Sequence, residues 1–352
     1  MSGAGWGVRG ARSGGVRGGV VTRLAAMALC GVACAGLAGC EPDLRVPYIP
    51  PTLAKWPEPY AGTGGLTVDV FTVGTIRAPE GAVLRGGSVL RTREMPVTAA
   101  VIRHPRHGLI VCNTGLKEPV TSDHRDGWLP RALLPEAIPA EALSAQMRAA
   151  RFDPAAVRWV VLTDLRMEHT GDAESFPRAR VVVAKAEQEY AQGGPASYRR
   201  SDVDDIGNWK FVEFDPPAPL ATFRAHVDLL GDGSVVLIDA AGATPGAMAV
   251  LVRLRERPLV LAGSLAAVPE MVRYAARPAA AYDIERWWDT IWRLKRFRDL
   301  VPALVVVPDR DPSGIAAAGV PSLRAHGAAA TAPSPTPSAS TDWLRRLLPR
   351  PL

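Results

Sequence analysis

A cluster of charged side chains follows one of the most strand-like segments of this 352-residue chain. Val157–Thr163 is apolar and β-branched, which predicts a buried strand, and Asp164, Arg166, Glu168 and His169 come directly after it. Carboxylate and imidazole groups can bind metal ions or transfer protons. A guanidinium group stays protonated and only donates hydrogen bonds, so Arg166 cannot be a metal ligand. The segment therefore has the residue types of a catalytic or metal-binding loop, except at one position.

This loop resembles that of the metallo-β-lactamase superfamily, in which Thr-His-x-His-x-Asp-His-x-Gly-Gly follows a strand. Asp164 and Arg166 stand at the first two His positions, Glu168 stands at the Asp position, and His169 retains the last His. The likeness covers roughly residues 66–313 and is closest to the branch that includes N-acyl homoserine lactonases. It implies an α/β fold, a four-layer αβ/βα sandwich of two mixed β-sheets flanked by helices. Further similar stretches are Pro96–Leu116, Phe152–Thr163, Val236–Val252, Leu259–Ser264 and Val305–Pro312.

The resemblance also indicates where the other metal ligands of the superfamily would lie. Thr244-Pro245-Gly246 is retained from a motif that carries two histidines, but those two positions are Ala243 and Ala247. The Asp that bridges the metals is replaced by Ser264, and the closing His is replaced by Arg310. Most of the ligand set is therefore missing from this chain.

These replacements argue against the zinc chemistry that the resemblance implies. A catalytic zinc ion needs three protein ligands and an open position, and Glu168 and His169 are the only remnants. Arg166 and Arg310 would also place two fixed positive charges near a dication, which is strongly unfavourable at intermediate dielectric. We therefore expect no cofactor, with zinc only if the site is rearranged.

One hypothesis gives the two arginines a role in place of the metal. Arg166 and Arg310 would pair with Asp164 and Glu168, with Asp311 as a further candidate, because a buried carboxylate without a cation is costly. Alternatively, these are ordinary exposed charges on loops.

The loss of most metal ligands favours a pseudoenzyme, a non-catalytic module that binds a small ligand or an envelope protein. A second function stays open as the alternative. The second is a hydrolase of lactones or esters with a rearranged single-metal or metal-free site, in which His169 and either Asp172 or Asp164 form an acid/base pair. No Gly-x-Ser-x-Gly or His-Glu-x-x-His motif supports another catalytic site. Assignment as an acyl homoserine lactonase would rest on fold likeness alone.

The amino terminus predicts export. Residues 1–39 combine four arginines with the apolar run Leu24–Ala38, which is typical of a signal peptide and too short to span a membrane readily. Leu37-Ala38-Gly39-Cys40 resembles a bacterial lipobox, so Cys40 is predicted to carry lipid and anchor the protein to the membrane of the cell envelope. Removing 1–39 lowers the net charge from +6 to about +2, and no basic stripe with aromatics predicts nucleic-acid binding. Cys112 is then the one remaining cysteine besides Cys40 and is predicted to lie in the core.

The composition divides the chain into four parts. Residues 1–39 form the signal peptide, 40–65 a Pro/Gly-rich tether, 66–325 the domain, and 326–352 a low-complexity tail. His104–Gly108 (HPRHG) predicts a solvated hairpin turn, and Gly231-Asp232-Gly233 predicts another. Strands are predicted at Leu66–Val73, Val89–His104, Gly108–Gly115, Arg180–Ala184, Lys210–Phe214, Arg224–Leu230, Ser234–Asp239, Ala247–Leu254, Leu259–Leu261 and Ala303–Val307, and helices at Ala140–Arg151, Lys185–Ala191 and Asp283–Leu300.

Overall fold

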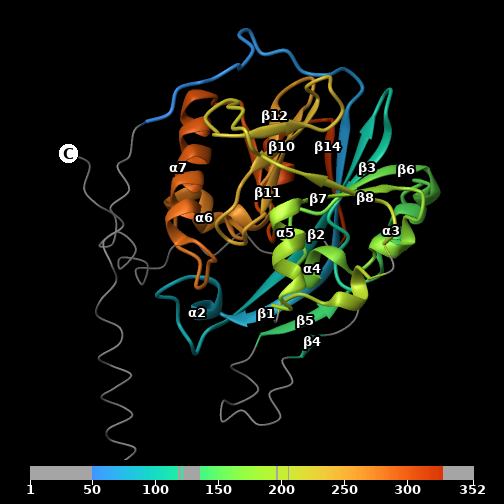
Figure 1. Cartoon of the computed structure of the whole chain (residues 1–352), viewed down its shortest axis with the longest axis vertical. Coiled ribbons are helices and arrows are strands. Elements are labelled where there is room, and N and C mark those ends of the chain that lie inside the picture. The colour runs from blue at the N-terminus through green and yellow to red at the C-terminus, as the bar shows by residue number, and fades with distance from the viewer. Residues whose placement is uncertain (1–49, 118–119, 122–134, 196, 205, 328–352) are drawn as a thin grey trace, which may run out of the picture. The chain divides into compact units, whose positions relative to one another are not determined.

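A computed structural model describes residues 50–117, 120–121, 135–195, 197–204 and 206–327 (Figure 1). The predicted signal peptide, Cys40, the first part of the tether and nearly all of the predicted tail lie outside the described residues. Within the part of the chain that is described, no helix has the length and apolarity needed to cross a membrane.

The larger of two β-sheets has the strand order β4-β5-β1-β2-β3-β6-β7-β8, with β14 paired in parallel to β1. The neighbours β3, β6, β7 and β8 are mutually parallel, so their carboxyl ends meet at one edge of the sheet. These strands are β1 (Thr67–Pro79), β2 (Thr92–His104), β3 (Gly108–Cys112), β4 (Val120–Thr121), β5 (Glu136–Pro139), β6 (Val157–Val161), β7 (Arg180–Ala184), β8 (Trp209–Val212) and β14 (Leu323–His326).

The smaller sheet has the order β13-β12-β11-β10-β9. Its strands are β9 (His226–Asp228), β10 (Val235–Asp239), β11 (Met248–Arg253), β12 (Pro258–Leu261) and β13 (Val305–Val307). The helices are α2 (Glu80–Val83), α3 (Leu143–Ala149), α4 (Met167–Thr170), α5 (Lys185–Gln192), α6 (Pro269–Tyr274), α7 (Ile284–Leu300) and α8 (Gly314–Ala318). Figure 1 shows α6 and α7 beside the smaller sheet and α3, α4 and α5 beside the larger one.

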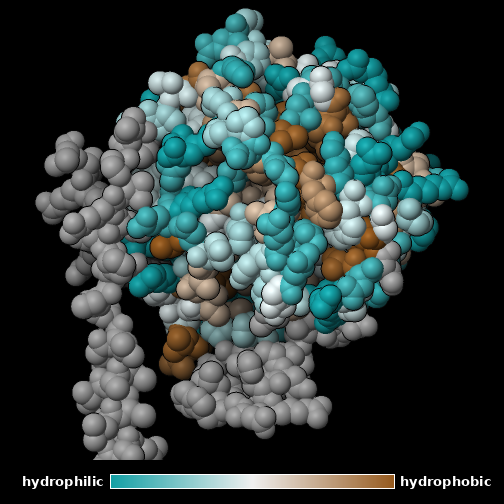
Figure 2. Space-filling model, in the orientation of Figure 1, coloured by the Kyte–Doolittle hydropathy of each residue, from teal (hydrophilic) through white to brown (hydrophobic). Residues whose placement is uncertain are grey.

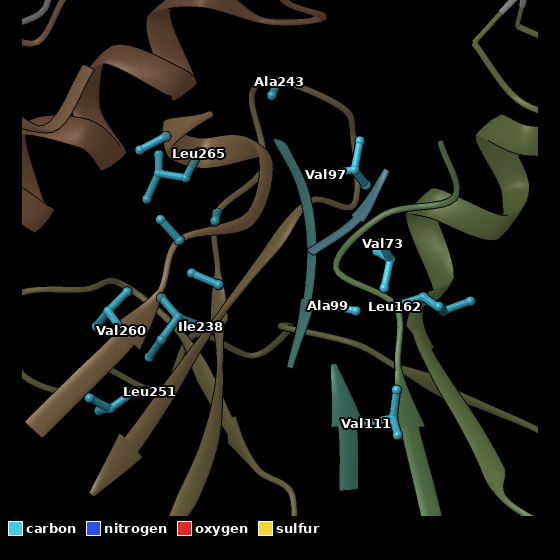
Figure 3. Close-up of a cluster of buried hydrophobic side chains, with 14 of the residues drawn as sticks. Val73, Val97, Ala99, Val111, Leu162, Ile238, Ala243, Leu251, Val260 and Leu265 are labelled. Carbon is cyan, nitrogen blue, oxygen red and sulfur yellow. The ribbon is translucent and has the colours of Figure 1, made fainter. Parts of the chain in front are cut away.

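The core has two parts because each sheet buries both of its faces. Side chains from both sheets meet between them, including Ile110 and Cys112 of β3 and Leu237 and Val250 of the smaller sheet. Alternate residues of the same strands point to the helical layers, because successive side chains of a strand face opposite sides. Figure 3 shows part of this outer cluster, with Ile238, Leu251 and Val260 on the smaller sheet and Val111 on the larger one.

The predicted fold class is confirmed: two mixed sheets are flanked by helices in a four-layer α/β sandwich. Strand β7 has the predicted bounds, and helices α3 and α7 lie within the predicted ranges. The elements that sequence patterns missed are short or lie at edges: β4, β5, β14, α2, α4, α6 and α8. Cys112 is buried, as predicted.

Residues near the predicted domain boundaries contact the domain. Trp56, in the predicted tether, packs edge-to-face on Phe297 with ring centroids 4.8 Å apart. At the other end, His326 lies in β14, where it pairs with Phe71 of β1. The described part of the chain on both sides of 66–325 therefore adds to the sandwich.

Helix α7 anchors the smaller sheet through its tryptophan stripe. Trp287 and Ile291 are fully buried, and the indole N–H of Trp287 donates to the carbonyl of Leu265 over 2.9 Å. Trp288 and Trp292 of the same stripe are partly buried and pack against this core. Outside these layers, the face seen in Figure 2 is mostly hydrophilic, with small hydrophobic areas showing between polar side chains.

We expect Gly242→Ala to destabilise the domain clearly more than Gly231→Ala. Both glycines have positive φ, +141° and +79°, but a Cβ at Gly242 would lie 2.4 Å from the backbone nitrogen of Trp287, whereas one at Gly231 would meet nothing within 4 Å. Overpacking against backbone adds about 2 kcal/mol to the cost of the unfavourable φ. Urea unfolding of both variants measures the difference, and equal losses would contradict the expectation.

Candidate functional site

The loop after β6 is held at the carboxyl ends of the parallel strands. Asn113, just after β3, accepts the backbone N–H of Thr163 at 2.9 Å through its side-chain oxygen, and it adopts a positive φ of 58°, which Asn tolerates. The backbone N–H of Thr114 donates to the carbonyl of His169 at 2.7 Å. These bonds fix both ends of the segment that carries Asp164 and His169.

His169 lies between two carboxylates. Its Nδ1 is 2.6 Å from Asp164 Oδ1 and its Nε2 is 3.0 Å from Asp309 Oδ2. His169 is 1% exposed and Asp164 is fully buried. Ser264, just after β12, donates its hydroxyl to the other oxygen of Asp164. Of the two acid/base partners predicted for His169, Asp164 contacts it, whereas Asp172 accepts the backbone N–H of Ser144 instead.

The two arginines reach this cluster in different ways. Arg310 Nη2 lies 2.5 Å from Glu168 Oε1, which is the predicted ion pair. The guanidinium of Arg166 donates to the hydroxyl of Ser264 (3.3 Å) and the carbonyl of Ala243 (3.2 Å).

Two predicted arginine–carboxylate pairs are not formed as expected. Arg166 hydrogen-bonds to Asp164 through its backbone N–H (3.0 Å) rather than its guanidinium. Asp311 accepts from the backbone N–H of Ser313 at 2.8 Å. The acids beside the arginines are buried, so the reading of these groups as ordinary exposed loop charges is wrong.

Burial and charge act in opposite directions on the central pair. Burial alone would raise the pKa of Asp164, but the adjoining imidazole and guanidinium charges lower it below its usual range. Burial alone would lower the pKa of His169, and the two carboxylates raise it well above its usual value. The pair is therefore an aspartate and an imidazolium at neutral pH, stabilised by an ionic contact in a low-dielectric site.

Glu187, a carboxylate that was not predicted from the sequence, accepts a hydrogen bond from the loop after β6. Glu187, fully buried in α5, accepts the backbone N–H of Leu165 at 3.1 Å and the hydroxyl of Thr244 at 2.7 Å. The hydroxyl of Tyr198 also donates to it. Burial raises the pKa of Glu187. Glu187 thus joins the loops after β6 and β10, although in sequence it stands in an ordinary polar helix.

Asp309 was also missed, although its position carried a signal. It follows the buried strand β13 within Pro308-Asp309-Arg310-Asp311, where an acid meets the same sheet edge as the loop after β6. The resemblance to the superfamily pointed to the neighbouring Arg310, which stands at the position of the closing His.

Comparisons with known proteins agree with the fold. The family model described as "Metallo-beta-lactamase superfamily" matches residues 130–308. The chain belongs to this superfamily. Over 178 residues it is 33% identical to the N-acyl homoserine lactonase AttM of Azorhizobium caulinodans and 34% identical to AttM of Rhizobium radiobacter. Each match covers 48% of this chain and 64% of the relative, so the matched region spans less than two thirds of these relatives.

Solved lactonase structures share the fold. The structure of AiiA from B. thuringiensis with N-decanoyl-L-homoserine at its active site has a TM-score of 0.58 and 15% identity, covering 70% of this chain and 93% of AiiA. An N-acyl homoserine lactone hydrolase with N-hexanoyl-L-homoserine bound at its catalytic metal center has a TM-score of 0.57, also at 15% identity and with the same coverage.

These comparisons correct one expectation from the sequence. We expected no cofactor, but the chain belongs to a metallo-hydrolase superfamily with lactonase relatives, and a similar structure holds its product at a metal center. For a member of this family a metal cofactor is the expectation, and the earlier prediction was wrong.

The residues at this site do not fit the metal centre that the family implies. Both ring nitrogens of His169 face carboxylate oxygens, so a metal ion would have to displace one of them. Ala243 and Ala247 offer no side-chain ligand atom. The guanidinium of Arg310 lies against Glu168, the other remnant of the ligand set. The side chains present therefore do not provide the ligand set of that centre.

A separate group of ligand-type residues lies at the opposite end of the strands. Atoms of His104, His107 and Asp232 come within 4.8 Å of one another. His104 is 2% exposed, which contradicts the prediction of a solvated side chain. Its Nδ1 accepts the backbone N–H groups of Arg106 and His107, each at 3.1 Å, so in the neutral ring the proton is on Nε2. That nitrogen lies 3.3 Å from Asp232 Oδ2 but makes no hydrogen bond with a described residue. Because it carries the proton of the neutral ring, it cannot bind a cation in that form.

We expect Arg310→Met to destabilise the domain by about 3 kcal/mol, because it leaves the largely buried Glu168 without its cation. This corresponds to a fall in Tm of roughly 6 to 12 °C for a domain of this size. Arg77→Met is the matched control, since the pair of Arg77 with Glu94 is 48% and 61% exposed and contributes at most about 1 kcal/mol. Calorimetry on both variants checks this, and an unchanged Tm for Arg310→Met would contradict the structural role.

We also expect stability to fall as pH rises from 6 to 8. The pKa of His169 is raised on folding, so its stabilisation is complete below the unfolded value of about 6.5 and is lost as pH rises toward the raised value, by up to about 1.4 kcal/mol per pH unit. The lowered pKa of Asp164 acts on the acidic side, below about pH 4. Urea unfolding at each pH should show this slope in the wild type and in the control His226→Gln, and a flatter one in His169→Gln. A wild-type stability that rises over this range would contradict the assignment.

Proposed function

We propose that this protein is a lactonase-like hydrolase that binds an acyl lactone or a related ester at the cluster of Glu168 and Arg310 and cleaves it with these side chains. The support is its membership of the superfamily and the identity of 33–34% to proteins named N-acyl homoserine lactonases. One observation carries the proposal. The guanidinium of Arg310 and the carboxylate of Glu168 lie side by side, and each keeps hydrogen-bonding capacity that no described residue fills.

Glu168 and Arg310 supply that donor and acceptor. Glu168 Oε1 accepts from Arg310 Nη2, while no residue in the described ranges donates to its Oε2. Arg310 Nη1 makes no hydrogen bond with a described residue, whereas Arg310 Nε is buried 3.8 Å from Asp309 Oδ2. The side chain of Arg310 is 15% exposed and that of Glu168 is 9% exposed, so both border solvent.

These two groups match the demands of ester hydrolysis. The carboxylate of Glu168 would take a proton from the attacking water, as a general base within hydrogen-bond reach does. The guanidinium of Arg310 would donate to the carbonyl oxygen as negative charge develops on it in the tetrahedral intermediate. The ion pair among Asp164, His169 and Asp309 would act as a positioning unit below them, since both nitrogens of His169 are occupied.

A second candidate is the non-catalytic binding module, which one observation favours. The hydrogen bonds of Asp164 and His169 are all made inside the protein, and such a closed cluster suits a structural role. The family relationships support the hydrolase reading better.

Hydrolysis of N-hexanoyl and N-decanoyl homoserine lactone by purified protein tests the proposal. We expect release of the ring-opened acid, followed by chromatography, and a loss of kcat of at least about 100-fold in Glu168→Gln. Glu189→Gln, an exposed acid on α5, is the control and should retain activity. Circular dichroism confirms that the variants are folded.

The metal content of the same samples separates the outcomes. Activity that is independent of bound zinc and lost in Glu168→Gln supports the proposed roles. Activity that follows zinc occupancy would overturn the side-chain mechanism while keeping the lactonase assignment. No hydrolysis with or without added zinc would overturn the hydrolase proposal and leave the binding module.

A further inference from the structure

A surface pocket of about 670 Å³ lies at the end of the sandwich opposite the cluster of Asp164 and His169. The turn between β2 and β3 and the first residues of β6 and β7 form it, because the amino ends of these parallel strands meet there. The distance to the other edge is about the length of β6, roughly 15 Å for five residues. We call it the basic pocket, and it is lined by His104, Pro105, Arg106, His107, Gly108, Arg158, Trp159, Arg178, Arg180 and Asn208.

Positive charge in the basic pocket is largely uncompensated. Four arginines line it, and Asp232 is the acid at ion-pair distance, 2.8 Å from Arg106. Burial alone would raise the pKa of Asp232, but hydrogen bonds from Ser234 and Arg106 lower it to about 2, so it remains ionised and offsets one guanidinium. Within the described ranges, Arg158 and Arg178 have no ion pair or side-chain hydrogen bond.

The walls of the basic pocket are held in place. Trp159 is flanked by two cations, with Arg180 Cζ 5.3 Å and Lys210 Nζ 5.1 Å from its ring centroid. The turn on the other side is tied by His104, which accepts two backbone N–H groups. In Figure 1 the β2–β3 hairpin projects at the upper right, and that edge of the molecule is hydrophilic in Figure 2.

We propose that the basic pocket binds a multiply charged phosphate group of a small ligand, independently of the cluster at the other end of the strands. Planar guanidinium groups match the oxygens of a phosphate with paired hydrogen bonds. The volume suits a small molecule rather than a single ion. Sequence reasoning found no basic stripe because the arginines come from three separate segments, each of which carries only one or two.

Other ligand chemistries fit less well. A metal cation is disfavoured by the four arginines and by the Nε2 proton on neutral His104. A nucleic acid strand needs a basic surface that continues along the backbone, whereas these arginines gather around one pocket. A phosphate can come from a soluble ligand or from a lipid headgroup, and both present the same chemistry.

Calorimetric titration with tripolyphosphate tests the proposal for a soluble ligand. Wild-type protein should show saturable binding at one site that weakens as salt increases. The double variant Arg158→Gln/Arg178→Gln should bind at least about 100-fold more weakly, tenfold for each lost charge-assisted contact. The matched control Arg91→Gln/Arg273→Gln removes two exposed arginines near α2 and α6 and should bind as the wild type does.

Vesicle sedimentation distinguishes the lipid source. Vesicles of phosphatidic acid in phosphatidylcholine, compared with pure phosphatidylcholine, present a phosphomonoester headgroup, which carries more than one negative charge near neutral pH as the proposed ligand does. The proposal is supported if either probe binds the wild type and the control but not the Arg158/Arg178 variant. The probe that binds shows whether the phosphate comes from a soluble ligand or from a lipid headgroup. Failure of both probes to bind, or equal losses in the two double variants, would overturn the proposal. Glu168→Gln should bind phosphate normally, so this outcome is separate from the hydrolase test.

Discussion

The imidazolium of His169 between Asp164 and Asp309 joins the two sheets at one edge of the sandwich. Asp164 follows β6 of the larger sheet and Asp309 follows β13 of the smaller one. Ser264, after β12, adds a second link to Asp164. Each carboxylate is buried, and a buried charge without a partner is costly. The loops must therefore keep this arrangement or lose much of their stability.

The same constraint explains how the superfamily fold persists with an altered ligand set. A metal ion supplies concentrated positive charge that holds loops of opposite sheets together. In this chain an imidazolium and the guanidinium of Arg310 lie against the carboxylates Asp164, Asp309 and Glu168. The network thus places positive charge between the loops, as a metal ion would. Its contacts, however, are hydrogen bonds and ion pairs between side chains. Any catalysis at this edge must use the groups that the network leaves accessible.

The two ends of the parallel strands differ in electrostatic character. At the carboxyl ends, acids and cations alternate in a buried and nearly balanced cluster. At the amino ends, exposed arginines surround a pocket with one ionised acid. Roughly the length of a strand separates the two groups, and the residues that line the basic pocket include none from the buried cluster. The sandwich can thus carry two binding sites that act independently.

The sequence alone, through its resemblance to a known superfamily, indicated the layers of the fold, and its residue types located the loop that carries the charged cluster. Periodicity located the buried strands and α7, and the residue types after Val157–Thr163 identified Asp164, Arg166, Glu168 and His169. Short elements such as β5 and β14 were not predicted, because they are strands through their pairing with β1 and not through a pattern of their own.

Only the tertiary structure decided which of these side chains meet. Asp309 is 140 residues from His169, and Glu187 is 57 residues from Thr244, so no local spacing could pair them. The arginines of the basic pocket come together for the same reason, since parallel strands bring distant segments to a common edge. The residue types limit which chemical reactions are possible, and the arrangement of the strands determines which side chains lie close enough to act together.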